Sequence, residues 1–158
     1  SGVSLRTVYH QFDDMESIHR LAGELLFARV QQIPARFDPS MPPSQAVDAY
    51  VRYRATVFDL LHPLSSAARI REPVSAALRT NRDEMLRYGE DNVRHAFAPE
   101  LADLKPAQAR RLVVAISLAT NWSAWYALLE ELQQSRAEAI AVMRATTRSF
   151  LTQPEQFA

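Results

Sequence analysis

Apolar residues recur along the chain at intervals of three and four, the spacing of one face of an α-helix. The first long stretch of this kind predicts a helix over residues 14–36. Asp13 and Asp14 stand at its start, and aspartate favours the N-cap position of a helix. The apolar face consists of Ile18, Leu21, Ala22, Leu25, Leu26, Val30 and Ile33.

The same spacing predicts helices over the rest of the chain, and prolines mark most of their ends. A second helix begins at Pro43 and ends before Pro63, with a short separate piece after it. A third runs over residues 73–97, and the last covers residues 136–151. Because no useful length of sequence alternates with a period of two, the pattern predicts an all-α fold, a helical bundle.

The segment at residues 106–132 differs, because apolar residues occupy two opposite sides of the helix that it predicts. A helix that is apolar all round must be covered all round. We expect a second copy to supply the cover, giving a homodimer with a four-helix bundle across its two-fold axis. The alternative is a helix at the centre of the monomer. The expected interface residues are Leu118, Trp125, Leu128, Leu132, Ile140, Met143 and Thr147.

Composition narrows the possible partners of the chain. Its 158 residues include 18 Lys and Arg and 18 Asp and Glu, so no overall charge attracts nucleic acid or a membrane. Contact with either would need a local patch. Cysteine is absent, which excludes disulfides and thiolate metal sites and fits a reducing compartment. With no unbroken apolar run of membrane length and no leader pattern, we expect a cytoplasmic protein without a membrane partner.

Patterns that would indicate catalysis or metal binding are weak. Asp91 and His95 lie one helical turn apart, but no third ligand follows at a recognisable spacing. Neighbouring acidic residues are typical of helix caps and solvated faces. No glycine-rich phosphate loop or nucleophile elbow occurs. We therefore expect no enzyme, no cofactor and no metal site.

The opening stretch, SGVSLRTVYHQF, predicts a tight turn followed by a short helix. Gly2 suits the turn and Ser4 suits the N-cap. Val3, Val8 and Phe12 are spaced to pack this helix against others. Its other side is polar, which suits phosphate oxygens and base edges in a major groove, although such a face is more often only solvated.

The stretch GVSLRTVYHQFDDMESI resembles the helix-turn-helix signature of the TetR family of bacterial transcriptional regulators. Shared features are a Gly-Val-Ser turn, a recognition helix ending in Thr-Val-Tyr-x-x-Phe, and an acidic cap before a long linking helix. NWSAWYALLEEL followed by SRAEAI is similar to the aromatic-rich dimer helix, turn and final helix of that family. The DNA-facing residues that the resemblance implies are Ser4, Arg6, Thr7, Tyr9 and His10.

The resemblance implies three parts in the chain. Residues 1–13 are the remnant of a helix-turn-helix domain, residues 14–36 the linking helix, and residues 37–158 a ligand-binding and dimerisation domain. The family has two further helices before the Gly-Val-Ser turn, so we expect a truncated chain that binds DNA poorly by itself. Met15 stands where the family often carries a lysine that reaches a phosphate.

The function implied is that of a ligand-responsive regulator, more often a repressor than an activator. Its dimer binds a palindromic double-stranded operator, and a small, mostly apolar effector in the core shifts the linking helix and releases the DNA. The alternative that we keep open is an all-α dimeric binding or scaffold protein. Such a protein would hold a peptide or a lipid between its helices and never contact DNA.

Polar residues on otherwise apolar stripes are candidates for effector contact, because buried polar groups need partners. Arg54 is one, and it has an alternative partner in Asp59 or Glu90. For Asn121 the alternative role is a hydrogen bond across the dimer. For His95 the alternative is a position at the protein surface. For the aromatic residues the alternative to ligand contact is packing in the hydrophobic core. The candidate ligand-binding residues are Arg54, Phe58, Met85, Tyr88, Asn92, His95, Asn121, Trp122 and Trp125.

Gly89 falls inside the third predicted helix, where glycine costs roughly 1 kcal/mol relative to alanine. A close approach, a kink or a cavity at this position is the expected reason for it.

Overall fold

A computed structural model describes the backbone from Leu5 to Ala158 and the side chains from Asp14 onward. Every regular element in this part of the chain is helical, which confirms the all-α prediction. The main helices are α1 (Leu5–Gln31), α2 (Pro43–Ala68), α3 (Ala76–Ala96), α4 (Ala98–Ala102), α5 (Pro106–Ala119), α6 (Trp122–Tyr126) and α7 (Arg136–Thr152), with short 3-10 helices at Glu72–Val74 and Pro154–Phe157 and a π-helical turn at Ala127–Glu131.

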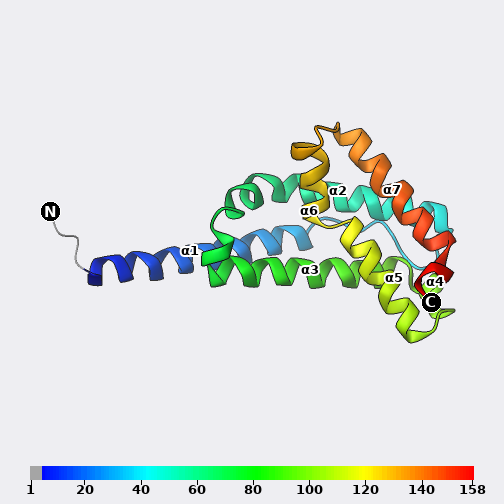
Figure 1. Cartoon of the computed structure of the whole chain (residues 1–158), viewed down its shortest axis with the longest axis horizontal. Helices are drawn as coiled ribbons and strands as arrows, with labels where there is room; N and C mark the ends of the chain where they lie inside the picture. The colour runs from blue at the N-terminus through cyan, green and yellow to red at the C-terminus, as the bar shows by residue number, and fades with distance from the viewer. Residues whose placement is uncertain (1–4) are drawn as a thin grey trace.

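The helices pack as a bundle from which the beginning of α1 projects (Figure 1). α1 and α3 run side by side, α2 runs back over them, α7 lies along α2, and α5 packs against α3 and α7. The apolar face predicted for α1 is therefore divided. Val30 is fully buried near the end of the helix, whereas Ile18, Leu21 and Leu25 are 57%, 53% and 60% exposed.

α1 is a single unbroken helix from Leu5 to Gln31, where the sequence predicted two helices that meet at Asp13 and Asp14. Both aspartates lie inside the helix, so they do not cap it. The helix also ends five residues earlier than predicted. Pro34 explains this end, because its ring disfavours helical backbone at the residue before it.

α2 begins at Pro43 as predicted, but it continues through Pro63 to Ala68 instead of ending there. Proline has no N–H and cannot complete the helical hydrogen bond to the carbonyl of Asp59. Contacts beyond the proline hold the last turns in place. The guanidinium of Arg69, just past the helix, lies 4.2 Å from the ring centroid of Tyr126 and makes an ion pair of 3.5 Å with Glu131.

The helix predicted over residues 106–132 is broken at Thr120 and Asn121. The Thr120 hydroxyl donates to the carbonyl of Ile116 at 2.7 Å and accepts from the Tyr50 hydroxyl at 2.8 Å. Asn121 has extended backbone, and its side-chain oxygen accepts from the backbone N–H of Ala124 at 2.8 Å, which makes it the N-cap of α6. The two halves therefore point their apolar sides in different directions.

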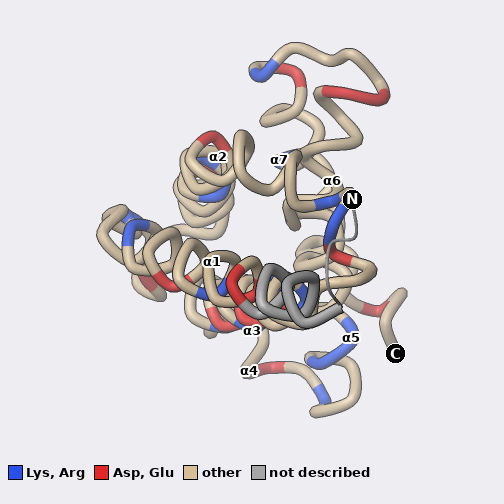
Figure 2. Tube along the Cα trace, turned by 90° about the vertical axis from the view of Figure 1, so that its left-hand side faces the viewer, with Lys and Arg blue, Asp and Glu red and all other residues tan. Residues whose placement is uncertain are grey.

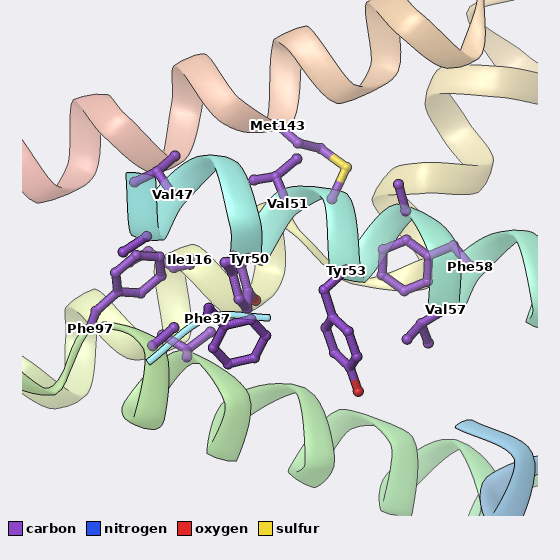
Figure 3. Packing of buried hydrophobic residues seen from close by; sticks show 14 of the residues in the cluster. Phe37, Val47, Tyr50, Val51, Tyr53, Val57, Phe58, Phe97, Ile116 and Met143 are labelled. Atoms are coloured by element: carbon purple, nitrogen blue, oxygen red, sulfur yellow. The ribbon is translucent and has the colours of Figure 1, made fainter. Parts of the chain in front are cut away.

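α2 lies at the centre of the core (Figure 3). Every residue of its predicted apolar stripe is at least 97% buried: Val47, Tyr50, Val51, Phe58 and Leu61. These side chains meet Phe97 at the end of α3, Ile116 of α5 and Met143 of α7, which are also buried. The ring centroids of Tyr50 and Phe97 are 5.2 Å apart in an edge-to-face contact.

One stretch of the described chain, Pro106–Glu131, is long and apolar enough to cross a membrane by length and composition alone. The break at Thr120 and Asn121 interrupts it, and Leu112, Val113 and Ile116 are buried in the core. Core helices of soluble proteins share this composition, so the composition does not assign the stretch to a membrane.

Met143 tests whether the interior of one chain holds this fold together. We expect Met143→Ala to lower the free energy of unfolding by about 2–5 kcal/mol, because it leaves a cavity beside α2. Val142→Ala is the matched control, since Val142 is the next residue and is 39% exposed. Urea unfolding of both variants at several protein concentrations is the measurement. An equal effect of the two substitutions, or a loss that grows on dilution, would contradict burial within the monomer.

Candidate ligand-binding site

A cavity of about 810 Å³ lies between α1, α2, α3 and α6. Its volume is in the range of small-molecule sites, which is about 300–1,000 Å³. Most of its wall is apolar, as is usual for such sites. The apolar wall includes Leu26 and Phe27 of α1, Phe58 and Leu61 of α2, Met85 of α3 and Trp122 of α6.

The structure brings five of the nine predicted ligand-binding residues to this cavity: Arg54, Phe58, Met85, Asn121 and Trp122. The other four lie elsewhere. Tyr88 contacts Phe27 and Tyr53 behind the wall, and Asn92 is half-buried one turn further along α3. His95 is exposed, as its alternative interpretation expected, and Trp125 is fully buried in the core. Helical periodicity predicted which helices carry these residues, but it did not predict which helix faces surround the cavity.

Arg54 is buried in the middle of α2, with 5% of its surface exposed. Its Nε donates to the backbone carbonyl of Thr120 at 3.2 Å, and its guanidinium carbon lies 4.6 Å from the ring centroid of Phe58. The two acids considered as its partners are engaged elsewhere. Asp59 binds Arg136 at 2.7 Å, and Glu90 lies 3.9 Å from Arg94.

No carboxylate among residues 14–158 forms an ion pair with Arg54. Burying a charge without an opposite charge is costly, and proteins usually avoid it. The arginine is therefore the most unusual electrostatic feature of the cavity wall.

Gly89 of α3 makes room for this arginine. A Cβ atom at position 89 would lie 3.2 Å from Nη2 of Arg54, closer than ordinary van der Waals contact. The sequence prediction of a close approach at Gly89 is confirmed.

Two further polar groups belong to residues of the wall. The Asn121 side-chain oxygen is used in capping α6, so its amide nitrogen is left for another partner. The indole N–H of Trp122 is buried and has no hydrogen-bond acceptor among the described residues. Both belong to the short segment that begins at the break after α5.

A polar junction between α1 and α3, which sequence analysis missed, closes one side of the cavity. The Asn81 amide donates to the backbone carbonyl of His19 at 3.0 Å. Gly23 permits this approach, because a Cβ there would overlap the Asn81 side chain. The imidazole Nδ1 of His19 lies 3.2 Å from the Ser75 hydroxyl. The available sequence signal was a glycine inside an otherwise regular helix.

Glu16 extends this junction by capping the beginning of α3. Its carboxylate accepts a hydrogen bond from the backbone N–H of Ala77 at 2.9 Å and lies 3.8 Å from His19. The hydrogen bonds from Ser75 and Ala77 hold the pKa of the Glu16 carboxyl below its usual value.

Three aromatic residues connect the three helices around the cavity. Phe27 of α1 packs edge-to-face on Tyr88 of α3, with ring centroids 5.4 Å apart. The Tyr88 hydroxyl is 2.6 Å from the hydroxyl of Tyr53 on α2. Burial, and then the Tyr88 hydroxyl, raise the pKa of Tyr53. A displacement of Phe27 would therefore disturb contacts of both α3 and α2.

The residues predicted for a dimer interface fall into two groups. Trp125, Met143 and Thr147 are at most 1% exposed within the single chain, so the prediction that they face a partner is corrected: the chain's own core covers them. Leu118 and Leu132 remain 67% and 60% exposed, and Leu128 and Ile140 are half-buried. Helical spacing identifies an apolar face but does not distinguish cover by the same chain from cover by a second one.

The predicted DNA-facing positions lie at the beginning of the chain. Ser4 lies outside the described residues. Arg6, Thr7, Tyr9 and His10 fall on the backbone of α1, and their side chains lie outside the described residues. Over the rest of the chain, viewed along α1, basic and acidic residues are interspersed (Figure 2).

None of the family models, curated proteins or solved structures compared with the chain matches it.

The Glu16 cap gives a pH-dependent contribution to stability. Because the pKa is lowered in the folded state, this contribution is present above the ordinary carboxyl pKa and is lost as the pH falls through the lowered value. We expect Glu16→Gln to lower the melting temperature at pH 7, and its difference from the wild type to shrink toward pH 3. Glu24→Gln is the control, since Glu24 on the same helix contacts only exposed Arg20 among the described ion pairs. A Glu16→Gln deficit that is constant with pH would oppose this account.

Proposed function

We propose that the chain is the regulatory part of a ligand-responsive transcriptional regulator of the TetR type, acting as a homodimer in the bacterial cytoplasm. One observation carries the proposal above the others. The helix that lines the cavity, α1, is the same continuous helix that carries the positions resembling the family's DNA-facing residues. A ligand in the cavity would therefore contact the element that holds the DNA-binding residues.

α1 supports a direct mechanical connection between the two sites. Arg6 and Phe27 are separated by about 30 Å along the helix axis, at 1.5 Å per residue. A tilt of about 5° at the cavity would move the far end by roughly 3 Å. In a dimer that reads two half-sites of one operator, a change in the separation of the recognition helices lowers affinity. Coupling between effector and DNA of about 1–3 kcal/mol is typical of such systems.

The junction between α1 and α3 supports the same mechanism. Asn81, Glu16 and His19 fix α1 to the beginning of α3 by hydrogen bonds that depend on one register of the two helices. An effector that separated these helices would break the bonds together. The junction would therefore have two discrete arrangements, as an allosteric switch requires.

A second copy of the chain has a surface available on α5. Val114 and Leu118 lie one turn apart and are 50% and 67% exposed. Of these, Leu118 belongs to the predicted interface, as does Leu132, which is 60% exposed, whereas Val114 and exposed Val142 of α7 were not among the predicted residues. We propose that this surface, not the buried residues first expected, pairs the two chains.

DNA binding is the first property to test, with the full-length protein as encoded. A selection against random duplex DNA at moderate salt should enrich a two-fold symmetric sequence. Thr7→Ala or Tyr9→Ala should then weaken binding to that sequence by about 10-fold or more, the usual effect of losing one base contact. Thr80→Ala, at an exposed position of α3, is the control and should bind as the wild type. A folded dimer that enriches no sequence would favour the scaffold alternative and remove the regulator proposal.

The pairing surface is tested separately. Leu118→Glu should convert the dimer to a monomer in analytical ultracentrifugation, because it places a charge at the centre of an apolar contact. Ile70→Glu is the matched control, since Ile70 is 83% exposed but lies between α2 and α3, away from α5. If Leu118→Glu leaves the mass unchanged, the dimer does not form through this face of α5.

A further inference from the structure

We propose that the ligand of the cavity is a monocarboxylate with an apolar body, and that the guanidinium of Arg54 binds its carboxylate. This inference rests on the proposed function only in taking the cavity as the effector site. It names the chemical class of the effector, which the resemblance leaves open.

The donors of Arg54 are the first part of the argument. A guanidinium has five N–H groups in a planar fork, and this fork matches a carboxylate. Among the described residues, only the Nε–H finds a protein acceptor, the carbonyl of Thr120. For the terminal nitrogens no hydrogen bond or ion pair is found with residues 14–158, although the side chain is 5% exposed and lines the cavity. A bound anion would supply the missing opposite charge.

The fold holds this guanidinium in place from three sides. The break after α5 leaves the Thr120 carbonyl without a helical hydrogen bond, so it is free to accept from Nε. The Phe58 ring lies under the guanidinium plane at 4.6 Å, and Gly89 leaves the space that Nη2 occupies. A side chain held this way loses little further freedom when it binds a ligand, which favours affinity.

The surroundings of Arg54 favour one negative charge on an apolar molecule. The other arginines of the cavity wall that form ion pairs do so near its rim: Arg69 with Glu131, and Arg82 with Glu72 at 2.6 Å. Arg71 also lines the wall without an ion pair among the described residues, but it is exposed, so Arg54 is the buried cation of the wall that is not already neutralised. One cation among Leu26, Phe27 and Met85 balances a carboxylate, whereas a phosphate dianion would leave a net charge in an apolar space.

Matched acids and alcohols test the proposal directly. The probes are octanoate and 1-octanol, 4-phenylbutanoate and 4-phenylbutanol, and 2-naphthylacetate and 2-naphthaleneethanol, titrated by calorimetry at pH 7.5. Within the pair that binds most tightly, we expect the acid to bind about 10- to 100-fold more tightly than the alcohol, the usual gain from a hydrogen bond to a charged group. Equal affinity of acid and alcohol would overturn the proposal.

Variants of Arg54 locate the effect. Arg54→Met should remove the preference for the acid and leave alcohol affinity within about threefold, because methionine keeps the apolar stem. Arg54→Lys should keep part of the preference, since it retains the charge but not the fork. Arg52→Met is the matched control two residues away on the exposed side of α2, and it should behave as the wild type. An acid preference that survives in Arg54→Met would overturn the assignment.

Stability without ligand separates a binding role from a structural one. An unpaired buried charge destabilises the empty protein, so we expect Arg54→Met to melt at or above the wild-type temperature. A lower melting temperature in Arg54→Met would show that the arginine is a structural group and oppose the proposal. If Arg54→Met does not fold, the same conclusion follows, and Arg54→Lys then reports the acid preference.

Failure of this proposal and failure of the proposed function give different results. Alcohols that bind as tightly as acids would leave an apolar effector site and remove only the carboxylate. No binding by any of the six probes would overturn the carboxylate and also oppose the cavity as an effector site. The DNA selection is read independently of both.

Discussion

The burial of α2 on nearly all sides is the constraint on which the rest of this structure depends. Tyr50 and Phe58 point toward different neighbours, yet both are at most 1% exposed. α1, α3, α5, α6 and α7 must therefore all turn a face toward α2. The burial of α2 also affects the ends of its neighbours. The hydrogen bond from Tyr50 to Thr120 lies at the point where α5 ends and a new helix begins.

The cavity is a consequence of the same arrangement. α2 is packed tightly along its first half against α7 and α5, as Figure 3 shows for Val47 and Val51. Toward its end, α6 turns away after Asn121, and Leu64 remains 51% exposed. Space between α1, α2 and α3 is left there, and the side chains at its edge are partly polar. The tight half supplies stability, and the loose half leaves room for a ligand.

Sequence patterns predicted the parts of the fold that depend on one helix at a time. The buried stripe of α2, the start at Pro43 and the all-α class follow from helical spacing and proline positions. The break at Thr120 and the continuation of α2 through Pro63 depend on contacts with residues distant in the sequence. No local sequence pattern predicts either feature. For the same reason, the spacing placed Met143 and Trp125 on apolar faces but did not show that the chain itself covers them.

The candidate site was predictable to the extent that its residues break a local pattern. Arg54 and Asn121 are polar residues on apolar faces, and both line the cavity. His95 also breaks the pattern but lies at the surface, because α3 turns that position outward near its end. The contact of Asn81 with the backbone of α1 had only Gly23 as a sequence signal, since an asparagine on a mostly polar helix does not by itself indicate a contact.

The space that Gly89 leaves for Arg54 makes substitutions at these two positions depend on each other. A Cβ at position 89 would lie 3.2 Å from Nη2 of Arg54, so the guanidinium would have to shift by a few tenths of an ångström to admit it. A shorter residue at position 54 would remove this contact and leave room on α3 for a side chain in place of Gly89. The choice of residue at one position therefore bears on the choice at the other, although the two positions lie far apart in the sequence.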